Sequence, residues 1–336
     1  MTPDVAVLGA GSWGTTLANL LARKGSRVRI WSYEAEVAEL INGEHENPAY
    51  LPGVALDPAL TALTDARAVV QGAGVVISVS PAQHVRGVVA AAGPSMRPDV
   101  ILVSASKGIE QQSLATMDEV FTDVLPAPVA RRATFLSGPS FAIEVAREQP
   151  TAVTVASRDE AAAMQVQSLF QTPYFRVYTS TDIVGVELGG ALKNVVALAA
   201  GMAAGLGLGH NASAALMTRG LAEIARLAAA RGANPLTLSG LAGMGDLILT
   251  CTGELSRNRH VGVELGRGRS LHQILDEMTM VAEGVHTARA AHALALQESI
   301  DMPIVAEVNA VLFGDTTARD ALENLMLREP KPELWR

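Results

Sequence analysis

Lysine is used sparingly in this chain, and two of its lysines stand where a reactive amine would be useful. Of the 26 Lys and Arg residues four are Lys, at positions 24, 107, 193 and 331, which leaves 22 Arg. Lys107 lies in a predicted loop at the end of a strand, and Lys193 lies inside the apolar segment 187–196. Because the pKa of an amine can fall on burial, we expect a proton donor and a direct substrate contact here. The alternatives are a solvated loop residue at 107 and an amine at 193 that reaches solvent from a helix surface.

A third candidate cluster carries the donors that a phosphate group requires. Asp246 follows a glycine-rich turn, and Ser256, Arg257 and Asn258 follow a little later. A hydroxyl, a guanidinium fork and an amide together suit a phosphate, and Asp246 could orient Lys193 or balance its charge. The alternative is that Asp246 merely caps a helix and that Arg257 is a surface cation.

A glycine-rich turn near the start of the chain predicts a dinucleotide site. A β-branched apolar run at 5–8 leads into Gly9, Gly11 and Gly14, and helical periodicity follows at 15–21. In the G-x-G-x-x-G pattern the first glycine permits a sharp turn, the second lets the backbone approach a pyrophosphate, and the third lets the helix pack on the strand. The helix N-terminus then favours the diphosphate charge. The alternative is a turn that only permits tight packing.

These candidates need elements to position them, and hydrophobic periodicity indicates a doubly wound α/β fold. Continuous apolar runs are typical of parallel strands buried on both faces. After the run at 5–8 they occur at 27–31, 75–79, 100–103, 133–136, 151–156 and 175–178. Helical segments lie between them at 83–92, 114–124 and 161–170. The alternation predicts an N-terminal Rossmann-type domain with a mostly parallel sheet, in which residues 42–58 form an ordered loop.

Beyond about residue 181 the strand-like runs disappear. Helices are predicted at 184–206, 212–231, 271–278, 285–297 and 303–313. We therefore expect an α/β domain at 1–182 and an all-α domain at 183–336. Ligands of such sheets bind at the carboxyl ends of the strands, which is where Pro81 and the loops 106–108 and 137–142 are expected.

Composition narrows the class of protein and its partners. The net charge of −8 argues against nucleic-acid binding, and the single cysteine, Cys251, excludes a disulfide framework and fits the reducing cytoplasm. The seven histidines form no metal-binding pattern, so no metal is expected. The longest apolar run, 195–209, contains four glycines and is shorter than the ~20 residues of a membrane span. Its small residues predict a close helix contact within a subunit or between subunits, and hence the hypothesis of a homodimer.

Seven motifs, taken together and in order, carry a resemblance. They lie at 9–14, 47–53, 106–108, 137–142, 187–194, 243–246 and 255–258. In these segments, which extend across most of the chain, the sequence resembles the bacterial NAD(P)-dependent glycerol-3-phosphate dehydrogenases. The resemblance implies reversible reduction of dihydroxyacetone phosphate to sn-glycerol 3-phosphate, which supplies glycerophospholipid synthesis.

The resemblance also implies roles for individual residues. Lys193 takes the place of the proton donor and acceptor, with Asp246 beside it in the catalytic group. The substrate contacts that it implies are Lys107, Gly138, Ser140, Lys193, Asp246, Ser256, Arg257 and Asn258. The implied NAD or NADP contacts, together with the glycine turn, are Gly9, Gly11, Ser12, Trp13, Gly14, Tyr33, Lys107, Ala142, Arg257, Val281 and Glu283.

The residues at the end of the second predicted strand leave the choice between NAD and NADP open. The end of the second strand normally contacts the adenosine ribose, with Asp or Glu in NAD sites and Arg in NADP sites. Here the sequence offers Ser32, Tyr33 and Glu34, and Tyr33 stands where the family often has Arg or His.

Lysine chemistry agrees with a dehydrogenase, and two other classes are weighed against it. An ammonium at position 193 would stabilise the charge that develops on a ketone oxygen and deliver the proton, which requires a pKa lowered by burial and neighbouring cations. One alternative is a related two-domain dehydrogenase that acts on 3-hydroxyacids or 6-phosphogluconate. The other is a non-enzymatic redox sensor, which has no need of a lysine inside a helix.

Overall fold

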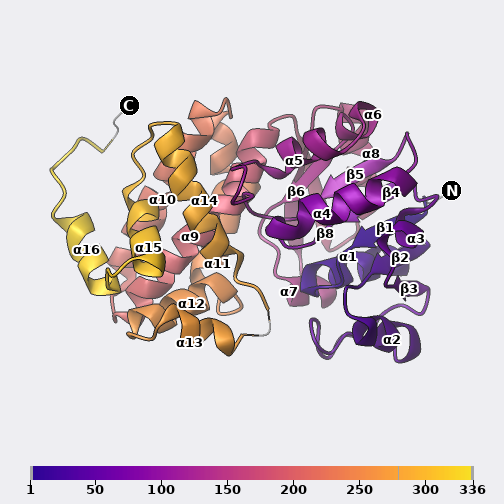
Figure 1. Cartoon of the computed structure of the whole chain (residues 1–336), viewed down its shortest axis with the longest axis horizontal. Helices are drawn as coiled ribbons and strands as arrows, with labels where there is room; N and C mark the ends of the chain where they lie inside the picture. Colours follow the sequence, from indigo (N-terminus) through magenta and orange to yellow (C-terminus); the bar gives the residue numbers. More distant parts are fainter. Residues whose placement is uncertain (1–2, 279, 334–336) are drawn as a thin grey trace.

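The chain folds into an eight-stranded sheet flanked by helices, with a helical bundle beside it (Figure 1). The computed structural model describes residues 3–278 and 280–333. The strands follow the order β3-β2-β1-β4-β5-β6-β7-β8, and their bounds are β1 Val5–Leu8, β2 Val28–Trp31, β3 Leu60–Leu63, β4 Val75–Ser78, β5 Ile101–Ser104, β6 Thr134–Ser137, β7 Thr151–Ser157 and β8 Phe175–Ser180. All neighbouring strands are parallel except β6 and β7. The predicted mostly parallel, doubly wound sheet is confirmed.

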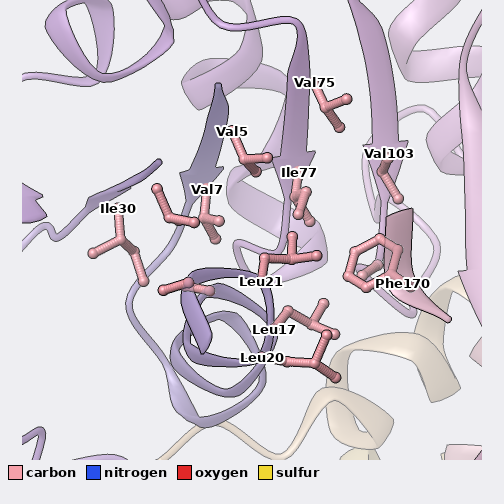
Figure 2. Packing of buried hydrophobic residues seen from close by; sticks show 14 of the residues in the cluster. Val5, Val7, Leu17, Leu20, Leu21, Ile30, Val75, Ile77, Val103 and Phe170 are labelled. Carbon is pink, nitrogen blue, oxygen red and sulfur yellow. The ribbon is translucent and has the colours of Figure 1, made fainter. Parts of the chain in front are cut away.

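Both faces of the sheet are covered, as the continuous apolar strands predict. Every residue of β1, β4, β5 and β6 is buried. On one face α1 (Ser12–Arg23) places Leu17, Leu20 and Leu21 against β1 and β4 (Figure 2), and α8 (Glu160–Phe170) packs on the same side. The other face is covered by α3 (Ala66–Val70), α4 (Ala82–Ala92) and α5 (Met117–Val124). The sheet order reverses between β1 and β4, which opens a crevice at their carboxyl ends.

The predicted loop 42–58 needs correction at its borders. The helix α2 (Ala35–Gly43) precedes it and the edge strand β3 follows it, and neither was predicted. Helix α2 buries only Val37, Ala38 and Ile41, so its apolar stripe is narrow. Strand β3 has four residues and alternates buried with exposed positions. Both elements are too short to give a clear period in the sequence.

The helical bundle is built around one long helix, α9 (Ile183–Gly205), of which 18 residues are buried. Around it in the bundle lie α10 (His210–Ala230), α11 (Asp246–Thr252), α12 (Arg257–Gly266), α13 (Leu271–Asp276), α14 (Glu283–Gln297), α15 (Pro303–Phe313) and α16 (Ala318–Met326). The long predicted helices are confirmed within two residues at each end. Helices α11, α12 and α16 were not predicted, and α13 ends two residues earlier than expected.

Helix α9 begins twelve residues before the apolar run 195–209, which was judged too short to span a membrane. Among the described residues it alone has the length and hydropathy to cross a membrane, with 23 residues and a mean hydropathy of 1.5. Within its most apolar window 89% is buried inside the protein. Its apolar side chains are therefore covered by the neighbouring helices, as in the core helix of a globular bundle.

The small residues of α9 serve a contact within the chain. Gly201 and Gly205 lie against Gly262 and Gly266 of α12, and a Cβ at Gly201 would lie 2.1 Å from the carbonyl oxygen of Arg259. The two helix backbones can approach this closely because neither carries a side chain at the crossing. The small residues were expected to make a close helix contact either within a subunit or between subunits, and the contact observed at these glycines lies within the chain. The homodimer stays a prediction, but Gly201 and Gly205 no longer support it.

Candidate active site

The glycine turn between β1 and α1 has the shape that a dinucleotide requires. Gly9 has a φ of +129°, and a Cβ on Gly14 would lie 2.0 Å from the carbonyl oxygen of Gly9. Gly11 differs, because a Cβ there would meet no atom within 4 Å. Gly11 is also the N-cap of α1, and no side chain caps the first amides of this helix. Open space in front of free helix amides suits a diphosphate.

Asn47, in the loop after α2, forms hydrogen bonds to the glycine turn and to the start of α1. Its Nδ2 donates hydrogen bonds of 2.8 Å to the carbonyl oxygen of Ala10 and of 2.8 Å to Oγ1 of Thr15. Asn47 belongs to the predicted loop 42–58 and to one of the seven motifs, but no role was predicted for it. Its buried amide closes the loop over the first turn of α1.

Other predicted cofactor residues surround the same crevice. The Ser12 hydroxyl donates to Sδ of Met280 at 3.3 Å, which links α1 to the helical bundle. Trp13 packs half-buried beside Phe175. Ala142 begins the short helix α7 (Ala142–Ala146), and its carbonyl oxygen accepts from Oγ1 of Thr16.

Tyr33 stands apart at the end of β2. Its side chain is 83% exposed and makes an edge contact with the Trp31 ring. The neighbouring Glu34 accepts a hydrogen bond of 2.8 Å from the Tyr50 hydroxyl. Both groups lie where an adenosine ribose is expected, and neither is a cation.

Asp246 joins the two lysines that sequence analysis singled out. Its Oδ1 lies 2.5 Å from Nζ of Lys193, and its Oδ2 lies 2.7 Å from Nζ of Lys107. Asp246 is 1% exposed and Lys193 is 7% exposed. The carboxylate thus bridges two ammonium groups at the first turn of α11. The alternative of a simple helix cap is wrong, because Gly245 holds the N-cap position.

The electrostatics of this group favour a titratable Lys193. Burial lowers the pKa of Lys193 to about 8; the Asp246 carboxylate opposes this shift and the Lys107 ammonium adds to it. Burial pushes the pKa of Asp246 upward, but the two ammonium groups outweigh it and hold that pKa below its usual value. The expected lowering of the Lys193 pKa by burial and a neighbouring cation agrees with this geometry.

Lys107 is anchored by the loop after β6. The carbonyl oxygen of Gly138 accepts from Nζ of Lys107 at 3.1 Å and from Oγ of Ser140 at 3.0 Å. Gly138 has a φ of +142°, and a Cβ there would lie 2.9 Å from Cα of Val153. The structure therefore places three predicted substrate residues, Lys107, Gly138 and Ser140, around one carbonyl.

The predicted phosphate cluster lies at the N-terminus of α12, a helix that sequence analysis missed. Ser256 is the N-cap, and its Oγ accepts from the Arg259 amide at 3.2 Å. Asn258 is buried; its Nδ2 donates to Oδ1 of Asn194 at 3.0 Å, and its Oδ1 accepts from the Gly284 amide at 2.9 Å. Arg257 is exposed, and its Nη1 donates to the Val281 carbonyl at 2.8 Å. The helix start offers amides and a cation in one place.

Glu283 and Val281 complete the helical side of the crevice. Oε1 of Glu283 accepts from the Ala82 amide at the start of α4, at 3.2 Å. Burial raises the pKa of Glu283 to about 7. Val281 is partly exposed.

A continuous edge joins the glycine turn to the lysine group. A Cβ on Gly9 would lie 3.1 Å from the amide nitrogen of Ser80, and the Ser106 hydroxyl donates to the Ser80 carbonyl at 2.7 Å. Lys107 follows directly. The carboxyl ends of β1, β4, β5 and β6 therefore lie along one edge that faces α9 and α11, with the predicted residues on both sides.

Thr250 belongs to the site and was not predicted. Its Oγ1 accepts from Nζ of Lys193 at 2.9 Å and donates to the carbonyl oxygen of Asp246 at 2.6 Å. The signal was its position four residues after Asp246, one helical turn later, but the sequence did not reveal α11.

The described residues form no cluster of metal-binding side chains. Across residues 3–278 and 280–333 no three His, Cys, Asp or Glu side chains are grouped to hold a metal ion. Cys251 is a free, buried thiol whose pKa is raised to about 12 by burial, which makes it unreactive.

Comparison with known proteins gives the same family from sequence and from structure. Residues 4–163 match the family model described as the N-terminus of NAD-dependent glycerol-3-phosphate dehydrogenase, and residues 182–323 match its C-terminus. Relatives named glycerol-3-phosphate dehydrogenase [NAD(P)+] include one from Geobacter sulfurreducens, 56% identical over 100% of both chains. Another, from Myxococcus xanthus, is 53% identical over 98% of both.

A solved structure agrees over the whole length. The crystal structure of glycerol-3-phosphate dehydrogenase from Coxiella burnetii matches 97% of this chain and 99% of its own, with a TM-score of 0.92 and 38% identity. Full coverage in both directions means that the sheet and the bundle are shared together. The chain is therefore a member of the NAD-dependent glycerol-3-phosphate dehydrogenase family.

Proposed function

We propose that this chain catalyses the reversible reduction of dihydroxyacetone phosphate to sn-glycerol 3-phosphate with NADH or NADPH. The observation that carries the proposal is the pairing of the buried Asp246 with the buried Lys193 and the half-buried Lys107, at the strand edge beside the glycine turn. When bound, the nicotinamide supplies the hydride that the ketone carbon receives.

Lys193 acts as the proton donor in reduction and as the acceptor in oxidation. Because its pKa lies at about 8, both protonation states are accessible near neutral pH, which suits a reversible reaction. Its ammonium also stabilises the negative charge that develops on the ketone oxygen. Asp246 and Thr250 hold Nζ in place through hydrogen bonds of 2.5 and 2.9 Å.

Two ammonium groups share one carboxylate, so the site carries a surplus positive charge. This surplus attracts an anionic substrate despite the net charge of −8 of the whole chain. The amides at the start of α12 and the Arg257 guanidinium are suited to the phosphate. Lys107 and Ser140 are suited to the rest of the small substrate, and holding it in register supplies much of the rate.

The dinucleotide site takes its diphosphate at Gly11 and the first turn of α1. Ser12, Trp13, Ala142, Val281 and Glu283 would line the rest. Tyr33 carries no charge, and Glu34 beside it would repel a 2′-phosphate, so we propose NADH as the preferred cofactor.

The two domains are proposed at 1–182 and 183–336, because β8 ends at Ser180 and α9 begins at Ile183. We also propose a cytoplasmic location, which fits the single cysteine, and a place in glycerophospholipid synthesis, which the proposed product would supply.

The decisive test is a kinetic comparison with purified protein. We expect fast oxidation of NADH with dihydroxyacetone phosphate, slower oxidation of NADPH, and none with 3-oxo acids. Activity with 6-phosphogluconate or 3-hydroxyacids, in place of glycerol 3-phosphate, would favour the related dehydrogenases instead. A higher kcat/KM for NADPH would overturn the cofactor preference alone.

A further inference from the structure

Three neighbouring strands end in a row of buried serines. Ser78, Ser104 and Ser137 are the last residues of β4, β5 and β6. Ser78 pairs in register with Ser104, and Ser137 lies two residues beyond Phe135, the partner of Ser104. In parallel strands this register places all three side chains on one face. Within the described part of the chain, none of these hydroxyls has a hydrogen-bond partner.

Glu187 of α9 faces the same region. Its Oε1 accepts from the Asp118 amide at 3.1 Å, whereas its Oε2 is buried and finds no partner among the described residues. Burial, together with the nearby Asp118 carboxylate, raises the pKa of Glu187 to about 8, although hydrogen bonds from the Thr116 side chain and the Asp118 amide oppose the shift. The carboxyl is therefore protonated at neutral pH and has an O–H to donate.

Ser104, Ser137 and Glu187 line one small cavity, and Lys107 forms part of its wall. The cavity offers about 10 Å³ to the centre of a water-sized sphere, roughly the room that one buried water needs. Leaving a buried polar group without a partner costs about 1–3 kcal/mol, and three such groups meet here. Buried waters are typically held by two to four polar partners.

We propose that one ordered water molecule occupies this cavity, bound by Ser104, Ser137 and Glu187, and that it keeps the stem of Lys107 directed at Asp246. Glu187 is then a positioning residue, and this second part rests on the proposed function. Cγ of Lys107 lies 3.7 Å from the place of a Cβ on Gly190 of α9, and Lys107 and Gly190 both line the cavity. A filled cavity therefore leaves the Lys107 stem less room to turn away from the Asp246 carboxylate.

A high-resolution crystal structure of the protein tests the water directly. We expect a density peak at about 3 Å from Oγ of Ser104 and from Oγ of Ser137. A dry cavity, or one filled by a rotated side chain, would overturn the proposal. This outcome does not depend on which substrate the enzyme accepts.

Two variants of Glu187 test its positioning role. Glu187→Gln keeps a hydrogen-bonding group of the same size, and Glu187→Met removes it. We expect Glu187→Met to lose about 10- to 100-fold in kcat/KM for dihydroxyacetone phosphate, and Glu187→Gln to stay close to the wild type. Because Lys107 lowers the pKa of Lys193, a displaced Lys107 also moves the alkaline limb of the pH–rate profile of Glu187→Met to higher pH.

A merely structural role would lower activity without moving that limb, and would affect both variants alike; this result overturns the positioning role. Ser137→Ala should share the effect of Glu187→Met in weaker form. Its matched control is Ser26→Ala, because the Ser26 hydroxyl is also buried without a partner among the described residues but lies in the turn before β2. If the wild type itself fails to reduce dihydroxyacetone phosphate, the proposed function fails, and the crystallographic test of the water still stands.

Discussion

At the scale of single residues, the proposed chemistry depends on one carboxylate, Asp246, that pairs with two amines. Asp246 is the only acidic group that the ion pairs of the described residues place on Lys107 and Lys193. Removing one partner from a buried pair leaves an uncompensated charge. Each member of the group therefore affects both the stability of the fold and the pKa of its neighbours.

Replacing Lys193 with Met removes the proposed proton donor but keeps the length of the side chain. We expect kcat for dihydroxyacetone phosphate reduction to fall by about 10²–10⁴-fold. In the wild type, kcat/KM for reduction should decline above about pH 8, because only the protonated amine donates. Steady-state kinetics across pH measure both effects.

Lys24→Met is the matched control for this substitution. Nζ of Lys24 donates to the carbonyl oxygens of Ser168, Leu169 and Gln171 at the end of α8. Lys24 is the C-cap of α1, at the opposite end of this helix from the glycine turn. Its loss should reduce the melting temperature and leave kcat unchanged. Undiminished turnover in Lys193→Met would mean that another group delivers the proton.

Asp246→Asn should shift the pH–rate profile as well as the stability. The carboxylate raises the pKa of Lys193, so its removal lowers that pKa and moves the alkaline limb to lower pH. The free energy of unfolding at neutral pH should fall by about 3–5 kcal/mol, and by less well above pH 8, where the Lys193 amine is neutral. Urea unfolding at the two pH values measures the difference.

Asp99→Asn provides the comparison, since the Asp99 carboxylate forms an exposed ion pair with Arg97, and such pairs contribute little to stability. An unmoved alkaline limb in Asp246→Asn would contradict the coupling between Asp246 and Lys193.

At the scale of elements, the glycines of the turn between β1 and α1 have two different roles: one allows close packing inside the fold, and another leaves room for a ligand. Gly14 permits a contact inside the fold, because its Cβ would lie 2.0 Å from a backbone oxygen. Gly11 permits an approach from outside, because its Cβ would touch nothing within 4 Å. Both glycines are needed because they lack a Cβ, but only Gly11 leaves that space to a ligand.

Alanine at each of the two positions should produce different defects. Gly14→Ala forces the backbone to shift and should destabilise the fold by about 1–3 kcal/mol. Gly11→Ala should keep the melting temperature and raise the dissociation constant of NADH about tenfold or more, or about 1.4 kcal/mol. Thermal unfolding and a fluorescence titration with NADH separate the two. Equal effects on both measurements in Gly11→Ala would contradict a pyrophosphate at that position.

Long apolar helices were predicted well from the sequence, whereas short or polar helices were not. Helix α9 was predicted within one residue at each end, because its apolar sequence is long. Helices α11 and α12 were missed, although Asp246 and Arg257 begin them. Helix α11 has seven residues and α12 carries Arg257, Asn258, Arg259 and His260 in its first turn, so neither shows a clear apolar period.

At the scale of the whole molecule, the sheet and the bundle meet along several separate contacts. Arg231 after α10 pairs with Glu119 of α5 at 2.5 Å, Gln111 donates to the carbonyl oxygen of His286, and Glu283 accepts from Ala82. The Lys107–Asp246 pair crosses the same boundary. Ligands held between the two parts should therefore stabilise the whole chain.

Stepwise addition of ligands measures this coupling. NADH at 100 times its dissociation constant should raise the free energy of unfolding by about 2.7 kcal/mol, and sn-glycerol 3-phosphate should add a second increment. Lys193→Met should keep the first increment and reduce the second, whereas Gly11→Ala, with a tenfold higher dissociation constant at the same NADH concentration, should lose about half of the first. A second increment that survives intact in Lys193→Met would place the substrate elsewhere.

The sequence by itself determined the classes of element, the glycine turn and the two unusual lysines, because these follow from local spacing and residue type. Apolar runs reveal strands, glycines reveal turns, and a rare amine in apolar sequence is visible without a structure. Only the tertiary structure decided that Asp246 bridges both lysines, that Thr250 joins them, and that Gly201 and Gly205 pack within the chain. Each of these contacts joins segments far apart in the sequence, and their distances depend on how the sheet and the bundle pack, which no local pattern records.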